Sequence, residues 1–229
     1  MASNRSLRRQ RRTPLDAEDP QKTALLESTE RLLRERPLVQ LTVDQISRGA
    51  NLTRTAFYRY FGRKEDAVVA LSARYFEIIF EGRKPFFSED RPLAEACREA
   101  VRNELSTWAE HGAVLRGLAD LGATDPELRE AWYAQVEQFV APVEQRIRSH
   151  AKQRGVPPPP HPRQVAEAFV WMAERYYYVW SGHYRHPTED VVEAVTWVMV
   201  SMMDGVPTGA AAPPRGASRS RRARHSRGA

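Results

Sequence analysis

The chain has 229 residues, which is long enough for one large folded unit or for a small module joined to a larger one. Hydrophobic residues make up 41% and charged residues 28%, as in ordinary globular proteins, so most of the chain is expected to fold. A single cysteine, Cys97, excludes an intrachain disulfide, and the lack of a long apolar run argues against a membrane span, so we expect a cytoplasmic protein.

Positive charge is concentrated at the two ends of the chain. The formal net charge is +6; residues 205–229 hold six arginines and no acid, and residues 1–20 hold five arginines and three acids. Residues 21–204 are therefore left with a net charge of −2. Polar, arginine-rich ends with few apolar residues predict a disordered arm over 1–20 and a disordered basic tail over 205–229.

Helical periodicity begins directly after the arm. Apolar residues recur at helical spacing, and Gly112, residues 122–126 and the proline run of residues 155–162 are turn signals between the helical segments. No alternating pattern typical of a strand appears. The fold class is therefore predicted as all-α, with about nine helices. They are expected over residues 21–36, 42–50, 53–60, 63–80, 92–110, 113–121, 125–154, 162–184 and 188–204.

Two short helices joined by a tight turn predict a helix-turn-helix between residues 42 and 60. Thr42 is a candidate N-cap with Gln45 as its capping-box partner, and Thr53 is a second candidate N-cap. Asn51 stands where the turn needs a left-handed residue. The inner face of the second helix carries Ala56 and Phe57. The residues left for DNA are Thr42, Thr53, Arg54, Thr55, Tyr58, Arg59, Tyr60 and, at the start of the next helix, Lys64.

Each of these side chains suits a different part of a DNA duplex. Helix N-termini at Thr42 and Thr53 present free N–H groups to phosphates, and the tyrosine hydroxyls and Lys64 can also reach phosphates. Arg54 and Thr55, at the front of the helix, are placed for base edges, because arginine matches guanine and the threonine methyl matches thymine. A solvated basic helix in an unrelated all-α domain is the alternative.

The segment LTVDQISRGANLTRTAFYRYFGRKEDAV resembles the helix-turn-helix of the TetR family of transcriptional regulators, and the likeness covers residues 23–70. RPLVQLTVDQIS, ATDPELREAW and the later WMAER are similar to the EthR-like subgroup of that family. The resemblance implies a DNA-binding domain over residues 21–66 and a larger helical ligand-binding and dimerisation domain over residues 67–204. Asn51 replaces the glycine that many relatives have in the turn.

The resemblance also implies an elongated, apolar, aromatic-lined ligand cavity in the second domain. An asparagine typical of the subgroup's cavity is Ala173 in this chain, which implies a different ligand. Aromatic residues at helical spacing are more often plain core, and that alternative stays open for each position. Carried over residue by residue, the ligand-binding positions are Trp108, Trp132, Val136, Phe139, Ala173, Glu174 and Tyr178.

The last two expected helices carry apolar residues on more than one face. Met172, Tyr176 and Val179 widen the first of them, and Val198 and Met202 widen the second, so a single core does not cover both. Relatives of the family are homodimers through these helices, and a dimer would place two recognition helices on one palindrome. Helices buried in a larger monomer are the alternative.

These features together predict a homodimeric one-component transcriptional regulator, most often a repressor, that a small apolar ligand releases from a palindromic operator. No catalytic grouping or glycine-rich phosphate loop appears, and His183 and His186 lack a third ligand, so no enzyme, cofactor or metal site is expected. A non-specific architectural protein that binds DNA through its basic ends is the alternative function. For each basic end, a merely solubilising role is the alternative to DNA contact.

Overall fold

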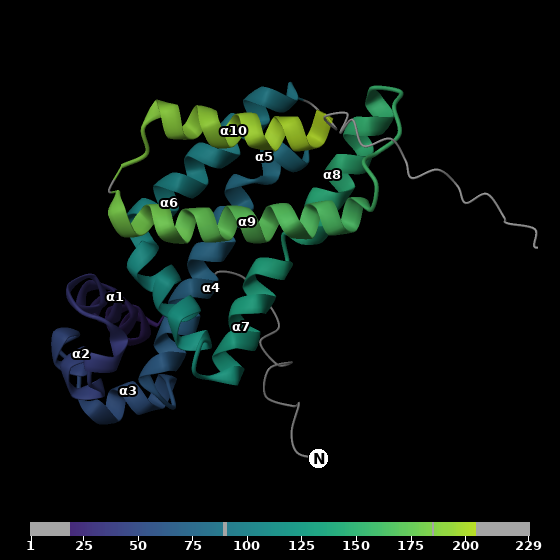
Figure 1. Cartoon of the computed structure of the whole chain (residues 1–229). Coiled ribbons are helices and arrows are strands. Elements are labelled where there is room, and N and C mark those ends of the chain that lie inside the picture. The colour runs from purple at the N-terminus through teal and green to yellow at the C-terminus, as the bar shows by residue number, and fades with distance from the viewer. Residues whose placement is uncertain (1–18, 89–90, 185, 205–229) are drawn as a thin grey trace, which may run out of the picture.

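A computed structural model describes residues 19–88, 91–184 and 186–204, and every regular element within them is a helix, which confirms the all-α class. Figure 1 shows a small group of helices, α1 to α3, at one end of a larger helical body. The elements are α1 (Pro20–Glu35), the short 3-10 turn η2 (Leu38–Gln40), α2 (Val43–Gly49), α3 (Arg54–Tyr60), α4 (Lys64–Gly82), α5 (Lys84–Phe87), α6 (Leu93–Gly122), α7 (Pro126–Glu137), α8 (Val140–Gln153), α9 (Pro162–His183) and α10 (Glu189–Asp204).

The small domain is held together by one buried side chain from each of its three helices. Leu25 of α1, Ile46 of α2 and Phe57 of α3 are fully buried. A hydrogen bond from the Ser28 hydroxyl to the Ile46 carbonyl, 2.8 Å, ties α1 directly to the backbone of α2. This core leaves the opposite face of α3 to solvent.

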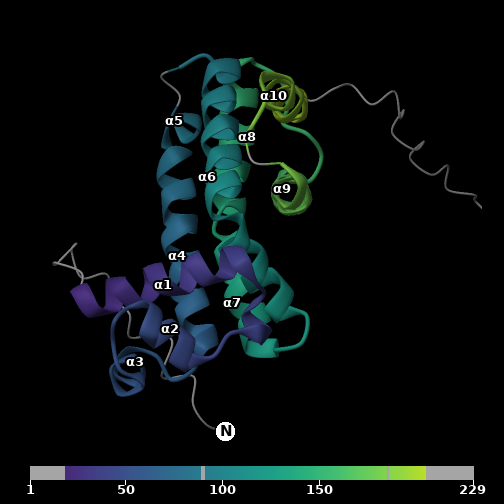
Figure 2. The ribbon, with the colours of Figure 1, turned by 90° about the vertical axis from the view of Figure 1, so that its left-hand side faces the viewer.

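The body is built around α4 and α6, the two helices that stand upright together in Figure 2. Helices α9 and α10 both pack on α6 and α8, on the side of the body away from α4. The domain boundary predicted after residue 66 falls in the first turn of α4. Because α4 is one continuous helix, it connects the small domain to the middle of the body.

Two predicted helix boundaries are wrong. Gly112 does not end a helix, because α6 is continuous; a Cβ atom at this position would lie 2.9 Å from Ser181 Oγ of α9, so the glycine permits close packing. Residues 125–154 form two helices, α7 and α8, rather than one. Pro142 stands in the first turn of α8, where a proline is tolerated, and the buried ring of Phe139 lies at the bend against Phe76 and Phe80.

The short helix α5 was also not predicted, and it has Pro85 in its first turn. Proline is compatible with the first turn of a helix, where its missing N–H would have no partner. The predicted arm and basic tail lie outside the described residues, except that Asp19 and Pro20 begin α1. None of the helices in the described ranges has the length and apolar character needed to cross a membrane.

Candidate DNA-binding surface and effector cavity

The exposed face of α3 carries the four side chains that the sequence assigns to it: Arg54, Thr55, Tyr58 and Arg59. Tyr58 is 46% exposed although its neighbour Phe57 is fully buried. Arg54 Nη2 donates to the Tyr58 hydroxyl at 3.1 Å, and the guanidinium lies 5.5 Å from the centre of the tyrosine ring. The two side chains are therefore held together as one surface feature.

Both predicted N-caps are confirmed. The Thr42 hydroxyl accepts from Gln45 N at 3.2 Å while the Gln45 side chain accepts from Thr42 N at 2.9 Å, which completes the predicted capping box at the start of α2. Thr53 Oγ1 accepts from Ala56 N at 3.2 Å and so begins α3. The turn between these helices has Asn51 at a φ of 56°, the left-handed conformation expected of it.

Tyr60 and Lys64 have protein partners. The Tyr60 hydroxyl donates to Asp19 Oδ2 at 2.6 Å, and this hydrogen bond, with the backbone amide of Gln21, lowers the pKa of Asp19. Lys64 Nζ donates to the carbonyls of Leu38 and Leu41 at 2.8 and 2.7 Å. Lys64 therefore holds the chain between η2 and α2, directly before the Thr42 cap.

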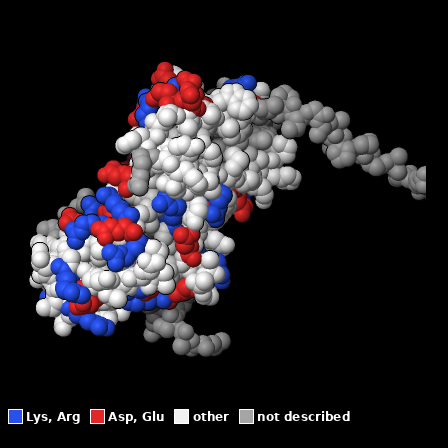
Figure 3. Space-filling model, turned by 60° about the vertical axis from the view of Figure 1, so that its left-hand side comes forward, with Lys and Arg blue, Asp and Glu red and all other residues white. Residues whose placement is uncertain are grey.

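Charged side chains are distributed unevenly over the surface. In the view of Figure 3, lysine and arginine side chains gather over the end of the molecule that α1 to α3 form. Acidic side chains lie among them, and the body above that end is mostly uncharged in the same view, apart from a mixed cluster of acidic and basic side chains at its far end. The basic groups therefore lie on the domain that carries the exposed face of α3, as a duplex-binding surface requires.

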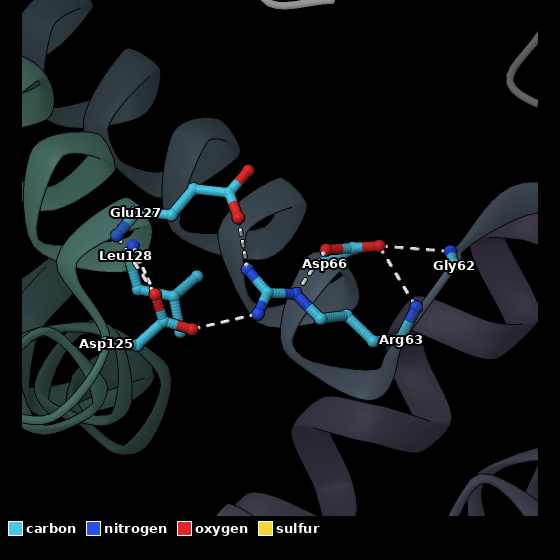
Figure 4. Close-up of polar contacts among 6 residues, drawn as sticks. All are labelled: Gly62, Arg63, Asp66, Asp125, Glu127 and Leu128. Atoms are coloured by element: carbon cyan, nitrogen blue, oxygen red, sulfur yellow. Dashed lines mark hydrogen bonds and ion pairs between the residues drawn. The ribbon is translucent and has the colours of Figure 1, made fainter. Parts of the chain in front are cut away.

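An ionic cluster around Arg63 connects this domain to α7, as Figure 4 shows. Arg63 Nη1 lies 2.8 Å from Asp125 Oδ2, its Nη2 lies 3.1 Å from Glu127 Oε2, and its Nε lies 3.2 Å from Asp66 Oδ1. Asp125 is also the N-cap of α7. Burial opposes ionisation of Asp125, but the bond from Arg63 and the backbone amides of α7 lower its pKa overall. The ion pairs of Arg63 therefore join the start of α4 to the start of α7.

Five of the seven predicted ligand residues surround a cavity of about 30 Å³ inside the body. They are contributed by α6, by the end of α7 and the residues after it, and by α9. Residues of α4 complete the wall. The predicted members are Trp108, Val136, Phe139, Ala173 and Glu174, and the other lining residues are Phe76, Ile79, Arg83, Glu104, Val170 and Tyr177.

The other two predicted ligand residues lie elsewhere. Trp132 is buried behind the wall, with its ring centre 5.5 Å from that of Phe76. Tyr178 points to a different side of α9, where its hydroxyl donates to Asp120 of α6 at 2.5 Å and Arg175 covers its ring. The neighbouring residue Tyr177 lines the cavity instead, because one residue along a helix turns a side chain by about 100°.

Sequence reasoning missed the buried ion pair of the cavity. Arg83 Nε and Nη2 lie 2.5 and 2.6 Å from the two oxygens of Glu104, with both side chains at most 5% exposed. The Arg83 guanidinium also lies 5.2 Å from the centre of the Phe139 ring. In the sequence, the one sign of this ion pair was an isolated acid, Glu104, on the apolar face of α6. Its partner Arg83 could not be foreseen, because only the tertiary packing brings the two residues together.

Glu174 is the second buried acid at the cavity. It is 5% exposed, and its Oε1 has no hydrogen-bond partner among the described residues. Burial raises the pKa of Glu174 to about 7, against the smaller opposing effect of Arg175, whose Nε lies 4.0 Å from Glu174 Oε2. A titratable group in an apolar cavity is typical of a ligand site.

Larger hollows occur at the surface, but none of the predicted ligand residues lines them. One groove of about 710 Å³ lies between α1, α6 and the end of α9 with the segment that follows it. A second, of about 510 Å³, lies between η2 and α6. Within the described part of the chain, no three His, Cys, Asp or Glu side chains gather as metal ligands. The internal cavity is therefore the place where the predicted ligand residues meet.

A helix-turn-helix with an exposed polar face, joined by α4 to a helical body with an internal cavity, defines the class of ligand-responsive transcriptional regulators. Residues 25–71 match the family model described as bacterial regulatory proteins of the tetR family, and residues 97–205 match the C-terminal domain of the transcriptional regulator EthR. The regulator EthR of Mycobacterium tuberculosis is 30% identical over 177 residues, which cover 76% of this chain and 82% of that protein.

Solved structures of the same fold agree with this match. The fatty acid degradation regulator FadR of Bacillus halodurans superposes with a TM-score of 0.66 at 14% identity, over 84% of this chain and 99% of that one. FadR of Bacillus subtilis in complex with stearoyl-CoA gives a TM-score of 0.65 at 15% identity, over 80% of this chain and 98% of that one. The chain belongs to the TetR family and is an EthR-type transcriptional regulator, not an enzyme.

Proposed function

We propose that the protein is a homodimeric repressor in the cytoplasm that binds a palindromic operator through α2 and α3 and leaves it when a small, largely apolar effector occupies the body. The observation that carries the proposal is the exposed face of α3, where Arg54 and Tyr58 are held together beside Thr55 and Arg59. These groups combine base-edge readers with phosphate ligands on one short helix.

Within that surface, the proposed roles differ. Arg54 and Thr55 contact base edges, and Thr42, Thr53, Tyr58 and Arg59 contact phosphates. Tyr60 and Lys64 act chiefly through their bonds to Asp19 and to the carbonyls before α2, which position the caps. The third N–H of Lys64 is left for a phosphate.

Dimerisation is supported by apolar side chains that the monomer leaves in solvent. Met172, Tyr176 and Val179 of α9 are 52, 42 and 50% exposed and follow one another at helical spacing. Trp197 and Val198 of α10 are 70 and 38% exposed. Large apolar side chains that are exposed on two helices of the same side of the molecule are typical of a protein–protein interface.

The size of the cavity suggests how an effector acts. A volume of about 30 Å³ holds about two water molecules, so an effector has to separate the surrounding helices in order to enter. Phe76 and Ile79 of α4, together with Arg83 directly after this helix, form part of the wall, and the other end of α4 follows α3 after a short turn. An effector would thereby select a conformation in which the two α3 helices of the dimer no longer match the operator.

The contact between α4 and α7 gives this movement a second connection. Val136 of α7 lies at the cavity, and Asp125 at the start of the same helix holds Arg63. Separation of α4 from α7 at the cavity would therefore strain the Arg63 cluster. That a protein of similar fold, FadR of Bacillus subtilis, is in complex with stearoyl-CoA supports a ligand with a long apolar part.

The test is a selection of bound duplexes from a random DNA pool, with the purified full chain at moderate salt. We expect enrichment of one palindrome, and loss of at least tenfold in affinity for it in Tyr58→Ala. The matched control is Tyr133→Ala, which removes a similarly exposed tyrosine from α7. Recovery of unselected DNA, bound equally by Tyr58→Ala, would contradict a sequence-specific repressor.

The same selection distinguishes the architectural alternative. If the basic ends supply the affinity, deletion of residues 1–18 and 205–229 abolishes binding and Tyr58→Ala does not. In the proposed repressor, the shortened chain still enriches the palindrome, with a weaker dependence on salt because fewer phosphates are neutralised.

A further inference from the structure

The charges around the internal cavity do not cancel. Three charged side chains from the described residues line it: Arg83, Glu104 and Glu174. Arg83 and Glu104 neutralise each other through two hydrogen bonds, a geometry in which a guanidinium and a carboxylate match. Glu174 is left as the acid whose charge no group inside the cavity balances.

The nearest cation does not remove that imbalance. Arg175 Nε approaches Glu174 only to 4.0 Å, and its side chain is 62% exposed. Its guanidinium lies over the ring of Tyr178, 4.6 Å from the centre, on the outside of α9. Oε1 of Glu174 is an acceptor without a donor in the described structure. The other polar atom of this lining without a hydrogen-bond partner is Arg83 Nη1, which belongs to a cation whose other two nitrogens are already paired with Glu104.

Aromatic rings complete the surroundings of this acid. Phe76, Trp108, Phe139 and Tyr177 all line the same cavity. The faces of aromatic rings carry partial negative charge and attract cations, more strongly where water is excluded. Burial and the neighbouring Glu104 raise the pKa of Tyr177 well above its usual value, so its ring stays neutral.

We propose that the effector carries a protonated amine on its apolar body, and that Glu174 binds this amine. The inference rests on the proposed effector role of the cavity and adds the chemistry of the ligand's polar end. An ammonium group supplies both the N–H donor that Oε1 needs and the positive charge that balances the cavity. A carboxylate in the same place would put a third acid beside Glu104 and Glu174.

The test uses four probes of equal chain length: octylamine, octyltrimethylammonium, octanol and octanoic acid. Affinity for the full chain is measured by calorimetry at pH 8, below the concentrations at which the probes aggregate. We expect octylamine to bind at least tenfold more tightly than octanol, octyltrimethylammonium to fall between them because it lacks an N–H donor, and octanoic acid to bind most weakly.

Glu174→Gln keeps the shape of the side chain and removes its charge. We expect this variant to lose the preference for octylamine while its affinity for octanol stays within about twofold. Glu167→Gln, an exposed change on the same helix, is the matched control and should keep the preference. If Glu174→Gln does not fold, the ranking of the four probes with the unmodified chain still decides the question.

A pH series gives an independent measurement. Octylamine stays protonated between pH 6 and pH 8 because amines of this kind titrate near pH 10. Its affinity should rise over this range by up to about tenfold as Glu174, with a pKa raised to about 7, loses its proton. The other charged groups near Glu174 are Arg83, Glu104 and Arg175. The affinity of octanol should not rise.

The outcomes separate this proposal from the proposed function. Octanoic acid or octanol binding as tightly as octylamine, or none of the probes binding, overturns the amine site, whereas an operator found by selection still supports the regulator. Octylamine binding through Glu174 in a protein that enriches no operator supports the amine site and contradicts the regulator.

Discussion

At the residue scale, Glu30 connects the DNA-binding domain to the body. This α1 side chain is 14% exposed; its Oε1 lies 2.6 Å from His111 Nδ1 of α6, and Oε2 accepts a hydrogen bond from Tyr75 of α4. The rings of Tyr75 and His111 stack with centres 3.8 Å apart. Burial raises the pKa of Glu30, but the bonds from His111 and Tyr75 outweigh it and lower the value to about 2.

This pKa predicts acid-sensitive stability. Because the folded value of about 2 is below the ordinary 4.5, ionised Glu30 stabilises the fold above about pH 4.5, and that contribution is lost as the pH falls toward 2. Its size at neutral pH is about 3 kcal/mol. Glu30→Gln should therefore lower the free energy of unfolding at pH 7 and flatten its decline between pH 5 and pH 3.

Denaturant titrations over this pH range give the measurement. Glu35→Gln, on the same helix with a side chain 54% exposed, is the control and should behave like the unmodified chain. An unchanged acid slope in Glu30→Gln would show that other carboxylates cause the pH dependence.

Cys97 allows a second prediction at this scale. It is fully buried, and burial raises the pKa of its thiol to about 12, so almost no thiolate forms at neutral pH. We expect iodoacetamide to modify it at pH 8 at least a hundredfold more slowly in the folded protein than in denaturant. Mass spectrometry of timed samples measures this, and equal rates would mean that the interior is open.

At the element scale, the middle of α6 depends on a glycine. A Cβ atom at Gly112 would lie 2.9 Å from Ser181 Oγ and 3.0 Å from Ser181 Cβ, whereas at Gly117 of the same helix the nearest atom is 3.9 Å away. Gly112→Ala should destabilise the protein by about 1 kcal/mol by pushing α9 away, as overpacking does. Gly117→Ala should stabilise it by up to about 1 kcal/mol through helix propensity.

Thermal or denaturant unfolding of the two variants compares them directly. The double variant Gly112→Ala with Ser181→Gly removes the contact with Ser181 and leaves only Arg116 Nη1, the end of a flexible side chain, at 2.8 Å from the added Cβ. Relative to Ser181→Gly alone, which also loses the hydrogen bond from Arg116, Gly112→Ala should then cost little stability. A Gly112→Ala variant as stable as Gly117→Ala would mean that α6 and α9 do not approach as closely as the structure has them.

At the scale of the whole molecule, the exposed apolar side chains of α9 and α10 predict the oligomeric state. Trp197, 70% exposed on α10, is placed to become buried in the proposed dimer. Trp197→Glu should give a monomer by sedimentation at micromolar concentration, because the interface would bury an unpaired charge. Its affinity for a full palindrome should fall by at least tenfold.

Val39→Glu is the control, since Val39 is 81% exposed on η2, in the DNA-binding domain. That variant should keep the oligomeric state of the unmodified chain. A dimeric Trp197→Glu variant, or a monomeric unmodified chain, would place the interface on another surface.

The sequence predicted the DNA-binding half of this molecule well because its signals are local. The two caps, the left-handed Asn51 and the alternation of buried Phe57 with exposed Tyr58 each depend on residues within one or two helical turns. Tyr60 shows the limit of prediction from local signals. Its partner Asp19 is 41 residues away, so its hydroxyl bond was not foreseeable from spacing.

The cavity of the helical body could be predicted less completely, because its arrangement depends on contacts between residues far apart in the sequence. Family resemblance located Trp108, Val136, Phe139, Ala173 and Glu174, which share one cavity in the structure. Arg83 was not assigned a role, because a charged residue at the end of a helix is usually solvated, and only the packing of α4 against α6 brings it to Glu104. Which of two adjacent tyrosines lines the cavity depended on the rotation of α9.

By itself, the sequence determined the helical class and the helix-turn-helix, because these follow from periodicity, capping and turn chemistry within short segments. It indicated the family through the resemblance of its motifs to those of known regulators. Only the tertiary structure decided that α6 continues through Gly112, that Arg63 holds α7, and that one carboxylate oxygen of a buried acid in the cavity has no hydrogen-bond partner among the described residues. The physical reason is that close packing and the pairing of charges depend on which surfaces of distant helices meet.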